Sequence, residues 1–138
     1  MAGLILHASC VALDGRGLVL RGPSGAGKST LALHLMALGA ALVADDTVQL
    51  DRRGDAVIAH CPPAGRGLIE ARGIGVLRAV PAGPVPLAHV VDLGQVRDRL
   101  PPLRHVTLCG VDVPLHRCTG GIESAGALLQ LMRGGRHA

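Results

Sequence analysis

The sequence predicts an α/β fold, because a strand, a glycine-rich loop, a helix and a second strand follow one another in its first third. Residues 18–21 form a short apolar run that leads directly into the loop. Residues 30–38 are rich in leucine and alanine with apolar side chains nearly all round, which predicts a buried helix. Residues 40–44 return as a buried strand. This βαβ order predicts that the first part of the sheet is parallel.

The other elements are predicted from turn signals that separate apolar runs. Leu4 to Leu13 favours a strand, and the turn signal at Asp14 to Gly17 pairs it with residues 18–21 as a hairpin. Gly39 stands where helices commonly end in a left-handed residue. After the second strand we expect a hairpin over 47–60 and a loop over 62–67, followed by the stretch 69–77 that carries Glu70-Ala71-Arg72-Gly73 and by a proline-punctuated stretch over 81–86. The last third should form a strand over 87–93, a short helix or turn over 95–100, a hairpin over 106–115 and a helix over 122–132.

Length and composition limit the class of protein. The 138 residues are enough for one core, so we expect a single domain over residues 1–138. Apolar residues make up 49% of the chain without one Phe, Trp or Tyr, so leucine, valine, isoleucine and alanine must fill the core. The net charge of +4 suits an acidic partner, but no aromatic ring is present to stack on a base. We therefore expect no nucleic-acid partner.

Cysteine spacing and the start of the chain predict a cytoplasmic protein with reduced thiols. No C-x-x-C pair occurs among Cys10, Cys61, Cys109 and Cys118. The first residues have neither a charged n-region nor a cleavage site, and no apolar run reaches the ~18 residues of a membrane span. His105, Cys109, His116 and Cys118 do not have the spacing of a zinc finger, so buried thiols and surface histidines are the simpler interpretation.

The stretch RGPSGAGKST, residues 21–30, predicts a phosphate-binding loop. It satisfies G-x-x-x-x-G-K-[ST] between a strand and a helix. Backbone N–H groups of such a loop converge on phosphate oxygens, and the helix N-terminus adds partial positive charge. Lys28, the only lysine, would reach the outer phosphates of a nucleoside triphosphate or polyphosphate, and the Ser29 hydroxyl would ligate Mg²⁺. The predicted cofactor-binding residues are Gly22, Pro23, Ser24, Gly25, Ala26, Gly27, Lys28 and Ser29.

Two adjacent carboxylates, Asp45 and Asp46, end the strand that follows the predicted helix. Mg²⁺ prefers oxygen ligands and takes one or two carboxylates besides phosphates. Because neighbouring residues of a strand point to opposite faces, we expect one of the pair to face the phosphates. A transporter ATPase is excluded by length and by the missing L-S-G-G-Q motif, and a guanylate kinase by the missing tyrosines of a guanine pocket.

Four segments taken together resemble the catalytic domain of HPr kinase/phosphorylase, the bifunctional serine kinase of a sugar-phosphotransferase phosphocarrier. They are His7-Ala8-Ser9, the predicted phosphate loop, Leu42 to Asp46, and Glu70 to Gly75, in the family's order and spacing. The resemblance covers residues 4 to 80 well and the rest weakly. The chain is similar to a short form of the family, which has the catalytic domain without the usual N-terminal domain. It implies a phosphoenolpyruvate-carboxykinase-like variant of the P-loop nucleotide-binding fold with a central mixed sheet.

The resemblance also implies site residues, cofactors and partners. It places the family's metal ligands on Ser29 and Glu70 and implies ATP and Mg²⁺ as cofactors. It also implies HPr or a related phosphocarrier as the substrate, and assembly into a homo-oligomer, often a hexamer. The acid/base aspartate that takes the proton of the seryl hydroxyl falls on Asp46, and Arg72 is either a charge clamp or a salt-bridge partner. The implied catalytic residues are His7, Lys28, Asp46 and Arg99, the last in the segment Asp98-Arg99-Leu100.

Departures from the family leave several functions open. Pro23 and Thr30 stand where the family commonly has acids, and Leu115 to Gly120 matches the segment tied to dephosphorylation poorly. ATP-dependent kinase activity is therefore better supported than phosphorolytic dephosphorylation. A small-metabolite P-loop kinase and a nucleotide-binding regulatory module remain alternatives, and no base-reading motif distinguishes ATP, GTP and pyrophosphate as donors.

Overall fold

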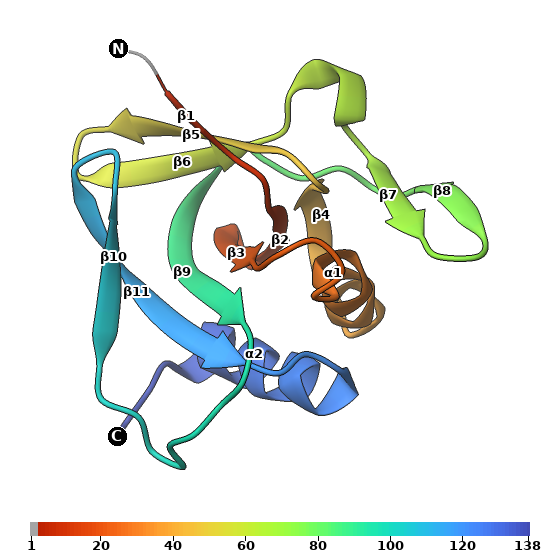
Figure 1. The fold of residues 1–138 in the computed structure, drawn as a ribbon. Helices are drawn as coiled ribbons and strands as arrows, with labels where there is room; N and C mark the ends of the chain where they lie inside the picture. The colour runs from red at the N-terminus through yellow and green to blue at the C-terminus, as the bar shows by residue number, and fades with distance from the viewer. Residues whose placement is uncertain (1–2) are drawn as a thin grey trace.

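Residues 3–138 are described by a computed structural model, in which a branched mixed sheet carries two helices and a separate hairpin (Figure 1). No helix of this part of the chain is long and apolar enough to cross a membrane. The elements are β1 (Leu4–Leu6), β2 (Ser9–Leu13), β3 (Arg16–Arg21), α1 (Lys28–Ala37), β4 (Ala41–Ala44), β5 (Val48–Arg53), β6 (Ala56–His60), the 3-10 turn η1 (Pro63–Gly65), β7 (Leu68–Ala71), β8 (Gly75–Arg78), β9 (Val85–Leu93), β10 (Arg104–Leu108), β11 (Val111–Cys118) and α2 (Ile122–Gly134).

The order of the main sheet corrects one prediction. Strands run β1-β5-β6-β9-β3-β2-β4, so β3 and β4 are not neighbours, and β2 lies between them, antiparallel to both. The first part of the sheet is therefore antiparallel between neighbours, although β3 and β4 do run in the same direction. The reason is the tight turn at Asp14 (φ 52°) and Gly15 (φ 74°), which folds β2 onto β3 before the helical crossover begins.

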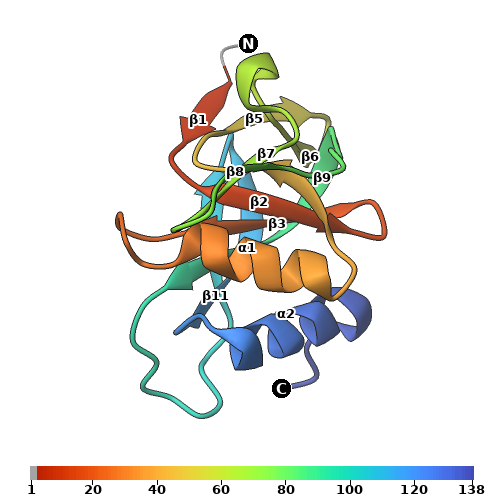
Figure 2. The ribbon, with the colours of Figure 1, turned by 90° about the vertical axis from the view of Figure 1, so that its right-hand side faces the viewer.

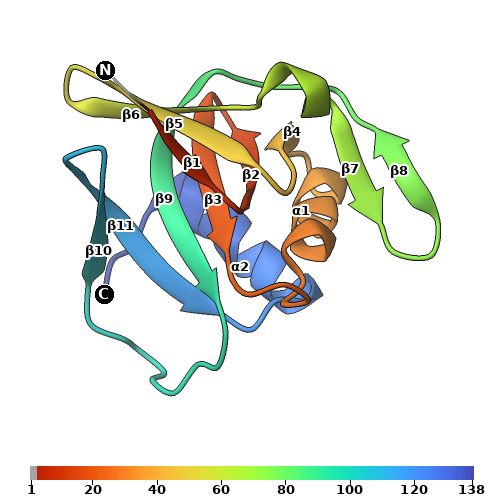
Figure 3. The same ribbon diagram turned by 45° about the horizontal axis from the view of Figure 1, so that its top comes forward.

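Strand β9 is the branch point of the sheet. One of its edges pairs with β3 in parallel, and the other pairs with β6 at Val85 and Pro86 and with β11 from Val90 to Leu93. The β5–β6 and β10–β11 pairs consequently diverge from β9 (Figure 3). Because β3, β9 and β11 are parallel, their carboxyl ends lie at the same edge of the sheet.

Two buried apolar clusters occupy the two faces of the central strands. Cys10 and Val19 belong to the cluster beneath the diverging arms, whereas Val11 and Leu18 belong to the cluster beneath the helices. Helices α1 and α2 lie side by side on that second face (Figure 2). Burial of both faces explains the nearly continuous apolar runs of these strands. In the described residues the buried apolar side chains are aliphatic or sulfur-containing, as the aromatic-free composition requires.

Three further differences concern element boundaries. The predicted strand from Leu4 to Leu13 breaks at His7, because β1 leaves to pair with β5. Residues 95–100 form no helix; all of them are exposed, so no face is buried to stabilise a helix, and two prolines follow at once. Helix α1 begins at Lys28, two residues before the predicted start, and ends before Gly39, whose φ of 111° confirms the predicted left-handed residue.

Candidate active site

The glycine loop, residues 22–27, joins the carboxyl end of β3 to α1. Gly25 and Gly27 have φ of 83° and 97°, which side chains rarely adopt. A Cβ on Gly22 would lie 3.1 Å from that of Ala26 and 3.3 Å from that of Leu93, so close packing also favours glycine there. The strand–loop–helix context predicted for this motif is therefore present.

The only lysine is enclosed by this loop. Lys28 is the first residue of α1 and is 8% exposed. Its Nζ donates to the carbonyls of Gly22 at 2.7 Å and Pro23 at 3.2 Å. The ammonium thus adds a full charge to the partial positive charge at the amino end of the helix.

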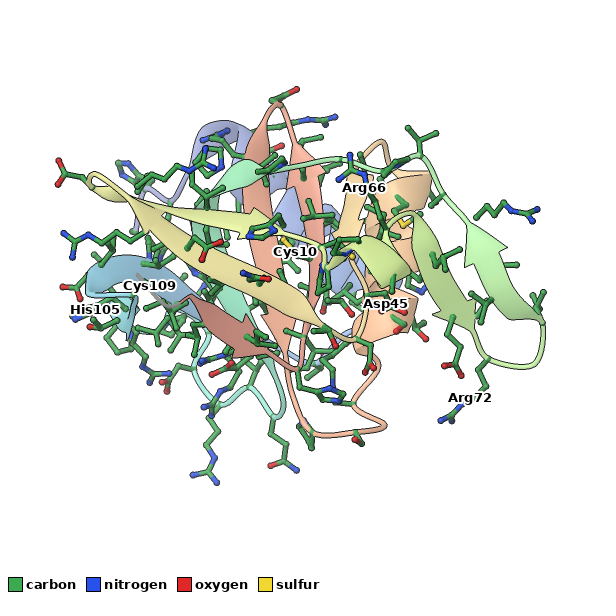
Figure 4. The ribbon with its side chains drawn as sticks, turned by 90° about the horizontal axis from the view of Figure 1, so that it is seen from above. Cys10, Asp45, Arg66, Arg72, His105 and Cys109 are labelled. Atoms are coloured by element: carbon green, nitrogen blue, oxygen red, sulfur yellow. The ribbon has the colours of Figure 1, made fainter. Side chains whose placement is uncertain are left out.

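Asp45 connects three elements around the start of α1. Its Oδ1 accepts from the hydroxyls of Ser29 at 2.6 Å and Ser9 at 2.8 Å, and its Oδ2 accepts from the backbone N–H of Glu70 at 3.1 Å. Figure 4 shows Asp45 beside α1. In the sequence Asp45 is one of two adjacent carboxylates at a strand end, and its contact with Ser29 is not predicted. The only signal for it is the position of this strand end after the helix that begins with Lys28 and Ser29.

Asp46 lies beside His7 rather than beside Ser29. The carboxylate Oδ1 is 3.3 Å from Nδ1 of His7, and the two side chains are 73% and 60% exposed. The backbone N–H of Ala8 also donates to the carbonyl of Asp46 at 3.1 Å. Strand β4 ends at Ala44 and Asp46 has a left-handed φ of 69°, so the alternation expected of a strand does not separate the pair.

The β7–β8 hairpin supplies Glu70 and Arg72. Ile69 is buried in the cluster beneath the helices, which anchors β7 against α1 and leaves the neighbouring Glu70 exposed. Gly73, with φ of 83°, helps to form the turn after Arg72. Figure 4 shows Arg72 extending from this turn, and no carboxylate of residues 3–138 lies within salt-bridge distance of it.

These segments form one pocket of about 340 Å³, here called the glycine-loop pocket. It brings together most of the predicted site residues. Its lining residues are His7, Ser24, Gly25, Gly27, Lys28, Ser29, Thr30, Asp46, Glu70 and Arg72. Four predicted residues are not among them. Gly22, Pro23 and Ala26 belong to the glycine loop but do not line the pocket. Arg99 lies in the coil after β9 and lines a separate pocket, here called the arginine pocket, together with four other arginines. Its catalytic role stays a prediction.

The oxygen atoms around Ser29 fit a magnesium ion that also binds phosphates. The donors are the hydroxyl of Ser29 and nearby carboxylates, the ligand type that Mg²⁺ prefers. Within residues 3–138 no three His, Cys, Asp or Glu side chains gather as a metal cage. Mg²⁺ bound to phosphates takes only one or two carboxylates from a protein, and Glu70 and Asp46 line this pocket.

Fold and site together define a class of protein. It is an α/β protein with a mixed sheet, a glycine loop before a helix, and two acidic residues after the strand that follows this helix. The family model of the HPr Serine kinase C-terminal domain matches residues 2–81, more than half of the chain. The chain belongs to this family.

Individual relatives agree with this assignment. The HPr kinase/phosphorylase of Bordetella pertussis is 45% identical over 73 residues, which are 52% of this chain and 24% of the relative. The HPr kinase/phosphorylase of Burkholderia lata is 47% identical over 73 residues, 52% of this chain and 23% of that protein. The chain thus matches about a quarter of the length of these relatives.

A solved structure extends the likeness of the fold to nearly the whole chain. The HPr(Ser) kinase/phosphatase from Coxiella burnetii matches with a TM-score of 0.75 over 94% of this chain and 93% of that chain, at 24% sequence identity. This match confirms the α/β fold with a central mixed sheet, including the C-terminal part that the family model does not cover.

Proposed function

We propose that this protein is an ATP-dependent protein-serine kinase that uses Mg²⁺ and phosphorylates HPr or a related phosphocarrier. The observation that carries the proposal is the convergence of His7, Lys28, Asp46 and Glu70 on one pocket around the glycine loop. Membership of the family and the activity in the names of its relatives support the same conclusion.

The glycine loop would bind the phosphates of the nucleotide. Lys28 carries its charge into the loop, and the helix N-terminus adds to it. We take the fold to be the phosphoenolpyruvate-carboxykinase-like variant of the P-loop fold, acting as one catalytic domain over residues 1–138. A cytoplasmic homo-oligomer remains part of the proposal from the family resemblance.

Phosphoryl transfer needs a group that orients the attacking hydroxyl and accepts its proton. Asp46 is suited to this role, because its carboxylate is exposed in the pocket and within 3.3 Å of His7. The seryl oxygen forms a bond to the γ-phosphorus, the bond from that phosphorus to the β–γ bridging oxygen breaks, and the seryl proton moves to Asp46. His7 would orient the carboxylate during this step.

Mg²⁺, when bound, neutralises charge on the phosphate oxygens. Ser29 and Glu70 are the residues proposed to hold it. Asp45 keeps the Ser29 hydroxyl in place through a 2.6 Å hydrogen bond and accepts from the backbone N–H of Glu70. Asp45 is therefore a positioning residue that ties both proposed ligands to one carboxylate.

Incubation with purified HPr, ATP and Mg²⁺ tests the proposal. We expect the mass of one phosphate on an HPr serine, and none with the Lys28→Met protein. Phosphorylation of a small hydroxylated compound without any response to HPr would instead identify a metabolite kinase. Nucleotide binding without transfer to either acceptor would identify a regulatory module.

A further inference from the structure

Apart from cysteines, three polar or charged residues are buried within residues 3–138, namely Ser9, Lys28 and Ser124. Lys28 belongs to the glycine loop, and Ser124 donates to the carbonyl of Gly120 at 2.9 Å beside the start of α2. Ser9 is 0% exposed, and its hydroxyl donates to Oδ1 of Asp45 at 2.8 Å. Neither Ser9 nor Asp45 lines the glycine-loop pocket, so any effect of Ser9 on that pocket has to pass through its partner.

The pairing of β2 with β4 brings Ser9 to Asp45. The two strands are antiparallel, and their register ends at the pair Cys10 and Ala44. One residue further along each chain, Ser9 meets Asp45 just past the end of β4. The placement of β2 beside β4, which the sequence did not predict, therefore delivers a buried hydroxyl to this carboxylate.

Three donors from three elements hold the carboxylate of Asp45. An ionised carboxylate oxygen has about two acceptor sites, and the hydroxyls of Ser9 at 2.8 Å and Ser29 at 2.6 Å occupy those of Oδ1. Oδ2 accepts from the backbone N–H of Glu70 at 3.1 Å. Because these donors lie on β2, α1 and β7, the carboxylate is fixed in one orientation.

The orientation of Asp45 sets the direction of the Ser29 hydroxyl. A hydroxyl has one proton and two lone pairs, and only the lone pairs bind a cation. The proton of Ser29 points to Asp45, and Ser29 lines the pocket whereas Asp45 does not. The lone pairs of the Ser29 oxygen are therefore left for a ligand in the pocket. A carboxylate that turned away would release this proton.

We propose that Ser9 is a positioning residue for the magnesium site, an inference that rests on the proposed function. Its hydroxyl keeps the Asp45 carboxylate in the orientation that takes the proton of Ser29. Without this hydroxyl, one acceptor site of Oδ1 is open and the carboxylate is free to turn. The Ser29 oxygen then loses its fixed direction toward the pocket. Partners of metal ligands commonly act in this way, and their loss weakens metal binding.

Binding of a non-hydrolysable ATP analogue, measured by calorimetry in Mg²⁺ and in EDTA, tests this role. The ratio of the two affinities is here called the Mg²⁺ gain. Ser9→Ala should lower the Mg²⁺ gain by about tenfold and change the affinity in EDTA less than twofold. Ser124→Ala is the matched control, because it removes another buried hydroxyl that donates to the protein outside the pocket. It should keep the wild-type gain.

A second pair of variants separates the hydroxyl from the shape of the side chain. Ser9→Thr keeps a hydroxyl, whereas Ser9→Val has the shape of threonine without one. The Mg²⁺ gain should be at least fivefold larger for the Ser9→Thr protein. Thermal unfolding checks that each variant is folded.

A double-mutant cycle tests whether Ser9 acts through Asp45. In the Asp45→Ala protein no carboxylate is left to hold, so adding Ser9→Ala should change the Mg²⁺ gain less than twofold. A further tenfold loss in this background would overturn the proposed route. Where Asp45→Ala does not fold, the comparison of Ser9→Ala with Ser124→Ala decides alone.

Equal Mg²⁺ gains in the wild-type, Ser9→Ala and Ser124→Ala proteins overturn the proposal, and so do equal gains in the Ser9→Thr and Ser9→Val proteins. These measurements use no phosphate acceptor. The expected gains together with no transfer to HPr would therefore overturn the kinase function and leave the role of Ser9 in place. A wild-type protein that binds the analogue equally in Mg²⁺ and EDTA would overturn both this role and the magnesium site.

Discussion

The glycine-loop pocket and the arginine pocket enclose about 340 and about 330 Å³, yet their walls differ in charge. The first places Lys28 and Arg72 opposite Asp46 and Glu70, so its formal charges cancel. The second has five arginines and one aspartate. Chemistry on a phosphate group needs carboxylates to hold a metal and to accept a proton, whereas binding a phosphate needs only cations.

The two pockets also differ in how they are supported. The residues of the glycine-loop pocket lie at the ends of elements whose inner faces are buried, such as α1 and β7. Much of the arginine pocket lies on the coil 95–102, where most side chains are exposed. Phosphoryl transfer needs fixed geometry, and the difference in support agrees with the catalysis proposed for the first pocket.

The strongest test of this difference is Lys28→Met, which removes the only lysine of the chain from the glycine-loop pocket. We expect transfer to HPr to fall by about 1,000-fold, because the enclosed ammonium no longer stabilises charge on the phosphates. Steady-state transfer assays measure the change, and circular dichroism checks the fold. Normal turnover by a folded Lys28→Met protein would contradict the assignment of the glycine loop.

Asp46→Asn separates proton transfer from binding in the same pocket. An amide fills the space of the carboxylate but cannot accept the seryl proton, so we expect transfer to fall by about 100-fold. Nucleotide affinity should change less than twofold. Asp55→Asn, on the exposed turn between β5 and β6, is the control. A normal transfer rate in the Asp46→Asn protein would show that Asp46 is not the base.

Glu70→Gln tests the magnesium site proposed in the glycine-loop pocket. A neutral amide is a poorer ligand for a hard cation, so the Mg²⁺ concentration for half-maximal activity should rise by about tenfold. Activity at saturating Mg²⁺ should largely recover. Titration with Mg²⁺ measures this, with the exposed Glu123→Gln on α2 as control. An unchanged Mg²⁺ requirement would remove Glu70 from the metal site.

Asp45→Ala should affect stability as well as activity, because three hydrogen-bond donors lose the carboxylate that they share as acceptor. The hydroxyls of Ser9 and Ser29 and the backbone N–H of Glu70 all donate to this carboxylate. We expect the free energy of unfolding to fall by about 2 to 3 kcal/mol in urea titrations. Asp45→Asn keeps one acceptor oxygen and should lose less. Equal stability of the wild-type and Asp45→Ala proteins would argue against this network.

The smallest expected effect is a pH dependence at His89 on β9, whose Nδ1 lies 3.0 Å from Nε2 of His116 in the wall of the arginine pocket. Burial, the neighbouring His116 and then Arg16 lower the pKa of His89 from 6.5 to about 4. The unfolded chain then binds this proton more readily, so stability is full above pH 6.5 and falls as the pH drops toward 4. Thermal unfolding from pH 4 to 8 should show a flatter profile for His89→Gln. The exposed His105→Gln should keep the wild-type profile, and identical profiles for all three proteins would contradict the expectation.

Local features of the fold were predictable from the sequence, but strand pairing was not. The tight turn at Asp14, the helix after the glycine loop and Gly39 each depend on neighbouring residues, and all three are present. The position of β2 between β3 and β4 depends on contacts between distant segments, which periodicity does not encode. The coil over 95–100 was ambiguous because six residues are too few for a helical pattern.

The same distinction applies to the two pockets. Lys28, Asp46 and Glu70 belong to motifs with fixed spacing, so the sequence indicated them before the structure brought them together. The arginine pocket draws Arg97, Arg117 and other arginines from separate segments, and in the sequence its charges look scattered. The contact of Asp45 with Ser29 was missed because adjacent acids in a sequence do not show which one turns toward the helix.

Leu93 lies at the last position of β9, between the glycine loop that it contacts and the coil that follows it. Leu93 is 6% exposed, and its Cβ would lie 3.3 Å from a Cβ placed on Gly22. The chain after Leu93 enters the coil of the arginine pocket. A larger residue at this position would press on Gly22 at the start of the glycine loop. Leu93 thus contributes to the support of both pockets, although it lines neither of them.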